Sequence, residues 1–327
     1  ASSHWLLAWM GLEINTLAII PLMAQQHHPR AVEATTKYFL TQATAAATLL
    51  FASTTNAWMT GEWSINCLSH PSATTLATMA LALKVGLAPL HFWLPEVLQG
   101  LDLMTGLIMS TWQKLAPFAL LVQISPAMDP LTLTLLGLLS TIIGGWGGLN
   151  QTQLRKILAY SSIAHLGWMI IILQHTPQLT VLALGTYIIM TSTAFLTFKT
   201  ATSTKINTLA LTWAKNPTLT AMMLLTLLSL GGLPPLTGFM PKWLILQELT
   251  KQQLPLTATI MAMSALLSLY FYLRLCYAMT LTISPNTNNA TTPWRLQNSL
   301  PTLPLATLTT ATITLLPLTP AITALMY

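Results

Sequence analysis

Apolar residues occur along this chain in long runs that short polar segments separate, without the alternation typical of β-strands. A helix needs about 20 residues to cross a hydrocarbon core of about 30 Å. The runs that meet this length cover residues 5–24, 31–58, 73–98, 103–124, 130–149, 153–173, 178–199, 217–250, 255–281 and 300–326. The pattern therefore predicts an all-α fold, a polytopic transmembrane helix bundle formed by residues 1–327 as a single domain.

Two of the predicted spans contain a similar interruption. Residues Gly86 to Glu96 read G-L-A-P-L-H-F-W-L-P-E, and residues Gly232 to Lys242 read G-L-P-P-L-T-G-F-M-P-K. Both stretches carry Gly, Leu, Pro, Leu and Pro at the same places. A proline inside a helix removes a backbone donor and clashes with the preceding turn. Each stretch therefore predicts a broken transmembrane helix, whose freed backbone groups need protein or water around them.

The broken helices are the third and the eighth predicted spans, so they cross the membrane in opposite directions. A matched pair of interrupted segments is typical of transporters built from inverted repeats, where it points to the ion path. We therefore expect a first repeat over residues 1–125, a second over 130–281, and an extra C-terminal transmembrane helix over 300–327. The polar segment 286–293 is predicted to be the linker to that last helix.

Composition and charge support a membrane protein. Only 6% of the 327 residues are charged, against about 25% in soluble domains, and 53% are hydrophobic. The net charge of +6 is concentrated in a few loops, so it indicates membrane topology rather than a nucleic-acid partner. The two cysteines, Cys67 and Cys276, have no metal-binding spacing.

The basic residues of the loops follow the order of the spans. The odd-numbered loops carry Arg30, Arg155, Lys156, Lys199, Lys205, Lys215 and Arg295, whereas the even-numbered loops carry Lys251. Cytoplasmic-type loops hold the excess of Lys and Arg. The odd-numbered loops are therefore predicted to face the cytoplasm-equivalent side.

Four charged residues lie inside predicted spans, namely Glu13, Lys84, Lys114 and Lys242. At a rise of about 1.5 Å per residue, Glu13 lies about 12 Å and Lys84 about 16 Å from the start of its span. An ionised group at mid-membrane costs roughly 2.5–3.5 kcal/mol on insertion scales. These side chains either snorkel or pair to join helices, or they carry ions. Four such charges beside two helix breaks favour a proton path.

The proton path is predicted from what burial does to a lysine. Removal from water makes a lysine release its proton more readily, and a nearby carboxylate opposes this. Glu13 is the expected partner of Lys84, and Lys84, Lys114, His165 and Lys242 are predicted to form one polar line. Lys242, beside the second break, is the expected terminal exchange site, whereas Lys84 and Lys114 are expected in less interrupted helix. His91 either relays protons or bonds a carbonyl freed by the first break.

Several motifs together resemble a known family. They are Gly11–Asn15, His28–Ala31, Trp112–Pro117, Gly148–Lys156, Ala159–His165 and the two broken-helix stretches. The chain resembles, over essentially its whole length, the antiporter-like membrane subunits of mitochondrial NADH–ubiquinone oxidoreductase, respiratory complex I. Its Thr- and Leu-rich, charge-poor style is similar to vertebrate mitochondrial products. Against the family pattern, we expect the first helix to be missing from this sequence.

The resemblance implies a core subunit of complex I, in the mitochondrial inner membrane, that forms a proton-translocating channel. It implies that Glu13 faces Lys84, that Lys114 is the central lysine and that Lys242 is the outlet lysine. The chain is then an enzyme only as part of the complex, without cofactor or redox centre of its own. NAD, FMN, iron–sulfur clusters and ubiquinone belong to the complex. The implied partners are other membrane subunits, including neighbouring antiporter-like ones, and the lipid bilayer with cardiolipin.

Two other functions are compatible with the pattern of spans. A stand-alone cation/proton antiporter would share the broken helices, and co-purification with flavin and iron–sulfur subunits would distinguish it. A structural scaffold that carries no protons would tolerate replacement of the buried lysines, whereas a proton channel would not.

Overall fold

The computed structural model describes residues 2–25, 27–281 and 302–326, so the predicted linker 286–293 and Arg295 lie outside the described residues. The described residues form helices and no strand. The helices are α1 (Trp5–Ala24), α2 (Pro29–Thr60), α3 (Pro71–Val85), α4 (Trp93–Gly100), α5 (Leu103–Ser110), α6 (Trp112–Ile124), α7 (Pro130–Gly148), α8 (Leu154–Leu173), α9 (Pro177–Thr200), α10 (Ile206–Ala210), α11 (Thr212–Lys215), α12 (Pro217–Gly231), α13 (Phe239–Lys251), α14 (Pro255–Thr280), α15 (Leu303–Thr314) and α16 (Thr319–Met326). The predicted all-α fold is confirmed.

Proline marks where many of these helices begin. The helices α2, α3, α7, α9, α12 and α14 each start at a proline. The first helical position leaves its N–H without an intrahelical partner, so proline loses nothing there, and its fixed φ suits a helix. This is why the helix starts lie within a few residues of the predicted span boundaries.

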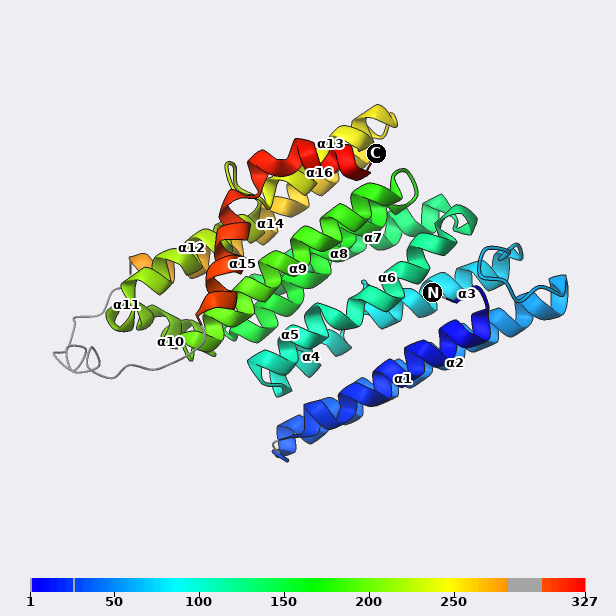
Figure 1. Ribbon diagram of the computed structural model, residues 1–327, viewed down its shortest axis with the longest axis horizontal. Coiled ribbons are helices and arrows are strands. Elements are labelled where there is room, and N and C mark those ends of the chain that lie inside the picture. Colours follow the sequence, from blue (N-terminus) through cyan, green and yellow to red (C-terminus); the bar gives the residue numbers. More distant parts are fainter. Residues whose placement is uncertain (1, 26, 282–301, 327) are drawn as a thin grey trace.

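The long helices run side by side in roughly parallel directions (Figure 1). The antiparallel pair α1 and α2 forms one edge of the molecule, and α12 to α16 lie toward the opposite edge. Helix α8 lies in the middle and is the most enclosed, with Leu154, His165 and Leu173 all buried. Close approach to α7 depends on Gly167, where a Cβ would lie 2.2 Å from the Ser140 hydroxyl. Small residues at such contacts are typical of membrane bundles.

Length and apolar composition alone qualify six of the described helices as membrane spans, or seven if the bent pair formed by α15 and α16 counts as one. This test leaves out three of the predicted spans. They are α2, which is rich in Thr and Ala, and the broken pairs α3–α4 and α12–α13, whose halves are short.

The two predicted interruptions are present and share their geometry. Helix α3 ends at Gly86 (φ 87°) and α12 ends at Gly232 (φ 80°), both in the left-handed region that favours glycine. Each glycine N–H still bonds a carbonyl of the preceding turn. The following X-Pro bonds, at Pro89 and Pro235, are both cis. The chain re-enters helix at Trp93 and at Phe239.

The structure also has two interruptions that we did not predict. The fourth span is divided at Thr111 (φ −114°, ψ −68°) into α5 and α6, so Lys114 follows an interruption where we expected less interrupted helix. The last span bends by 65° between α15 and α16 instead of running straight. Within this last segment the Thr312 carbonyl accepts a hydrogen bond of 2.6 Å from Thr237, inside the second break. Helix α15 therefore contacts that break.

Candidate functional site

Lys84 lies in a small internal chamber between the first helices. It is buried, at 6% exposure, and its Nζ has no hydrogen-bond partner among the described residues. The chamber has a volume of about 10 Å³, close to the lower limit for one water. The other polar groups that line it come from α1, α2, α4 and α6. They are Asn15, Thr16, Tyr38, Gln42, Trp93 and Gln113.

Glu13 lies in the neighbourhood of Lys84 without touching it. No ion pair within 4.0 Å joins these two residues, both of which the structure describes. The Glu13 carboxylate acts electrostatically on Lys84 and on Tyr38, and its Oε2 is buried without a hydrogen-bond partner in the described part of the chain. Lys84 Nζ and Glu13 Oε2 are thus both buried without a hydrogen-bond partner, and a water or a small movement that supplied one would stabilise them.

A second cluster surrounds Lys114 at the centre of the molecule. Lys114 is 2% exposed and donates a hydrogen bond of 2.9 Å to the Tyr187 hydroxyl, while its Nζ lies 4.7 Å from the centre of the same ring. A cation over an aromatic face at this distance is attracted to the ring. The Tyr187 ring in turn lies 5.7 Å from the ring of His165, centre to centre. The helices α6, α8 and α9 supply these three side chains.

Lys242 extends this cluster to the second helix break. Its Nζ donates a hydrogen bond of 2.8 Å to the Gly231 carbonyl, at the end of α12. His165 reaches the backbone of the neighbouring Leu230 and interacts electrostatically with both Lys114 and Lys242. The break is needed for this contact, because the Gly231 carbonyl has lost its helical donor and a Cβ on Gly232 would lie 2.9 Å from the lysine Nζ.

The predicted polar residues therefore fall into two groups. Lys114, His165 and Lys242 lie together around Tyr187 and the end of α12. Lys84 lies in its own chamber, and Gln113, which lines that chamber, immediately precedes Lys114 in α6. Gln113 and Lys114 are successive residues of α6 and point in different directions, one toward the Lys84 chamber and the other toward the second cluster. Helix α6 therefore joins the two groups.

His91 occupies the first break. Its Nδ1 lies 3.3 Å from the Pro89 carbonyl, and its ring makes tilted contacts with the rings of Phe92 and Tyr160 and does not line the Lys84 chamber. The geometry favours the carbonyl bond over a relay role. In the same break, the indole of Trp93 donates to the Leu83 carbonyl at 3.0 Å.

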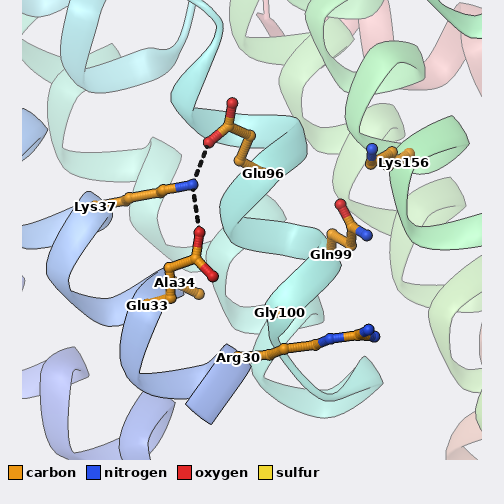
Figure 2. Close-up of a pocket in the computed structure, with 8 residues that line it drawn as sticks. All are labelled: Arg30, Glu33, Ala34, Lys37, Glu96, Gln99, Gly100 and Lys156. Atoms are coloured by element: carbon orange, nitrogen blue, oxygen red, sulfur yellow. Dashed lines mark hydrogen bonds and ion pairs between the residues drawn. The ribbon is translucent and has the colours of Figure 1, made fainter.

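A charged pocket was missed in the sequence. Lys37, nine residues into α2, lies 2.7 Å from a carboxylate oxygen of Glu33 and 2.7 Å from one of Glu96 (Figure 2). The pocket has a volume of about 360 Å³, and Arg30 and Lys156 line it too. Its members are half-exposed, and exposed pairs of this kind contribute little stability. The i, i+4 spacing of Glu33 and Lys37 was the available signal.

Tyr187 was also missed. One tyrosine in an apolar span gives no sign of its partner 73 positions away, so only the contact of Lys114 in α6 with Tyr187 in α9 identifies it. Among the described residues no group of three or more His, Cys, Asp or Glu side chains could hold a metal.

Comparison with known proteins defines the class of the chain. Residues 2–268 match the model of the NADH:quinone oxidoreductase/Mrp antiporter transmembrane family, and residues 269–323 match that of the NADH dehydrogenase subunit 2 C-terminus. The chain is similar, at 30% identity and a TM-score of 0.84, to a chain of respiratory complex I from Thermus thermophilus, covering 97% of this chain and 73% of that one. It is a membrane subunit of the antiporter-like class.

The particular family follows from closer relatives. NADH-ubiquinone oxidoreductase chain 2 of Carassius auratus is 77% identical over 99% of this chain and 93% of its own length. The same chain of Cyprinus carpio is 76% identical over 98% and 92%. The chain belongs to the NADH-ubiquinone oxidoreductase chain 2 family. It is therefore a multi-spanning subunit of proton-translocating complex I in the mitochondrial inner membrane.

Proposed function

We propose that this chain itself carries protons, through Glu13, Lys84, Lys114, His165 and Lys242. The observation that supports this best is the cluster in which Tyr187 contacts both Lys114 and His165, while His165 and Lys242 reach the adjoining backbone groups of Leu230 and Gly231. Three ionisable side chains from separate helices are held together in the apolar interior. Intramembrane groups of this kind are costly and typically mark ion paths.

The roles of the residues follow from their surroundings. Lys84 binds a proton more tightly when the Glu13 carboxylate is close, and it releases the proton when the carboxylate moves away. Lys114 and His165 pass the proton along the centre, and Lys242 exchanges it with solvent at the second break. His91 has no step in this path. The residue ranges 1–125 and 130–281 act as the two inverted repeats, each contributing one broken helix, and 300–327 is added to them.

The redox chemistry belongs to other subunits on this proposal. Oxidation of NADH through FMN and iron–sulfur clusters, and reduction of ubiquinone, supply the free energy, and this chain has no redox centre. Neighbouring antiporter-like subunits and the bilayer are its partners. The basic loops would attract anionic lipid headgroups such as those of cardiolipin. No nucleic-acid partner is expected.

The direct test is Lys114→Met in the assembled complex. Methionine keeps the apolar stem and removes the titrating group. The proposal predicts a lower ratio of protons pumped to electrons transferred. The matched control is Lys251→Met, since Lys251 is an exposed lysine 3.6 Å from Glu248 at the end of α13. An unchanged ratio for Lys114→Met would show that this chain is a scaffold for pumping elsewhere.

A further inference from the structure

Lys114 is held in the apolar interior without a carboxylate. No ion pair to it occurs among the described residues. Its partner is instead the Tyr187 hydroxyl, at 2.9 Å, together with the face of the same ring. Tyr187 is itself fully buried, at 0% exposure. The only means of stabilising the ammonium group that the described contacts provide is therefore this one tyrosine.

The orientation of the Tyr187 hydroxyl is fixed by the interruption of the fourth span. The hydroxyl donates to the Ser110 carbonyl at 3.1 Å. That carbonyl is free because the backbone N–H of Lys114 bonds Thr111, at 3.3 Å, instead of Ser110. With its proton directed at Ser110, the hydroxyl can offer Lys114 only a lone pair. The break at Thr111 thus turns the tyrosine into a dedicated hydrogen-bond acceptor.

This arrangement holds the lysine but does not relay its proton. In this orientation the proton of the hydroxyl points at the Ser110 carbonyl, which is not a base of useful strength, and the Ser162 hydroxyl is a second hydrogen-bonding neighbour of Tyr187. The Tyr187 ring also lies against His165, 5.7 Å between centres, so the same side chain contacts both the lysine and the next titratable group. A change in the position of this ring would alter both.

Building on the proposed function, we infer that Tyr187 is the positioning residue of Lys114. Tyr187 is the partner of Lys114 as Glu13 is the expected partner of Lys84. It offers a neutral hydrogen-bond acceptor instead of a charge. It fixes where the ammonium group waits before the proton moves toward His165. The role rests on its hydroxyl oxygen and not on the bulk of its ring.

The experiment compares Tyr187→Phe, Lys114→Met and the double variant in the intact complex. Tyr187→Phe keeps the ring and removes the acceptor. We expect a loss in the proton-to-electron ratio comparable to that of Lys114→Met, and no further loss in the double variant. Tyr277→Phe is the control, because Tyr277 is an exposed tyrosine in α14. Its ratio should remain that of the parent complex.

A second variant separates positioning from packing. Tyr187→His keeps an acceptor nitrogen but changes the shape more than phenylalanine does. A positioning role predicts that the histidine variant retains a higher proton-to-electron ratio than the phenylalanine variant. A packing role predicts the reverse order. If Tyr187→Phe does not assemble, the histidine variant still tests the inference. Complete loss of proton pumping in an assembled histidine variant would contradict it.

The outcomes distinguish the inference from the proposed function. A full ratio in Tyr187→Phe together with a lowered ratio in Lys114→Met would overturn the role of Tyr187 and leave the proton path standing. An additional loss in the double variant would show that Tyr187 does not act through Lys114. A full ratio in Lys114→Met would overturn the proposed function itself.

Discussion

Lys84 and Lys114 are two buried lysines with opposite kinds of surroundings. Lys84 has a carboxylate in its neighbourhood and no hydrogen bond, whereas Lys114 has a hydrogen bond and no carboxylate. The sequence identified both lysines because any charge in an apolar run stands out. It could not identify Tyr187, because the partner of a buried group depends on which helices meet, and a tyrosine in an apolar span is unremarkable.

A prediction at this scale concerns the charge balance of the Lys84 chamber. Glu13→Gln removes the carboxylate that acts on buried Lys84, and we expect a cost below the about 3–5 kcal/mol of a broken buried ion pair, because the two side chains do not touch. We expect a reduced amount of assembled complex and impaired pumping. The double variant Glu13→Gln/Lys84→Met should recover assembly, measured on native gels, but not pumping.

The control for this prediction is Glu62→Gln, because Glu62 is an exposed glutamate in the loop after α2. It should affect neither assembly nor pumping. If the double variant assembled no better than Glu13→Gln alone, Glu13 and Lys84 would not be coupled.

The helix breaks have two kinds of cause, local backbone geometry and tertiary contacts. The interruptions after Gly86 and Gly232 were predictable because glycine and proline dictate local backbone geometry. The division at Thr111 was not, because the surrounding residues Ser110, Thr111 and Trp112 carry no such signal. There the tertiary contact of the Ser110 carbonyl with Tyr187 compensates a lost helical bond. The bend between α15 and α16 lies near a proline, whose effect was overlooked.

The second break gives a prediction for a single element. Gly232 has φ 80°, and a Cβ there would lie 2.8 Å from Lys242 Cδ. Gly232→Ala should therefore displace the Lys242 side chain from the Gly231 carbonyl, in addition to roughly 1–2 kcal/mol for an L-residue in the left-handed region. Faster thermal inactivation of the complex and a lower proton-to-electron ratio are expected.

Gly185→Ala is the matched control, because Gly185 lies in α9 and a Cβ there meets nothing within 4 Å. Alanine also favours a helix more than glycine does. Equal behaviour of the two variants would mean that Lys242 does not depend on the geometry of the break.

At the scale of the whole molecule, the basic loops gather at one end. The segment around Arg155 pairs with that around Lys205 through the bridge between Gln153 and Lys205, and the Arg155 guanidinium donates to the Leu101 carbonyl. The end of α4 lies beside the start of α2, where a Cβ on Gly100 would lie 2.7 Å from the Arg30 carbonyl. Loops distant in sequence thus share one face, as the charge pattern predicted from sequence requires.

This arrangement predicts the orientation of the chain. The loops that carry Arg30, Arg155 and Lys205 should face the mitochondrial matrix, and the loop with Glu62 the intermembrane space. A membrane-impermeant amine reagent added to intact mitoplasts should leave Lys205 unmodified and modify it after the membrane is opened. Labelling of Lys205 from outside intact mitoplasts would reverse the topology.

The most direct test of a proton path through this chain is made at Lys242, where the path is proposed to reach solvent. The proton-to-electron ratio of the assembled complex should fall in Lys242→Met, which removes the titrating group. It should also fall in Lys242→Arg, which keeps the charge but cannot release a proton. Lys251→Met, changed at an exposed site, should retain the full ratio. A full ratio in an assembled Lys242→Met complex would contradict the account.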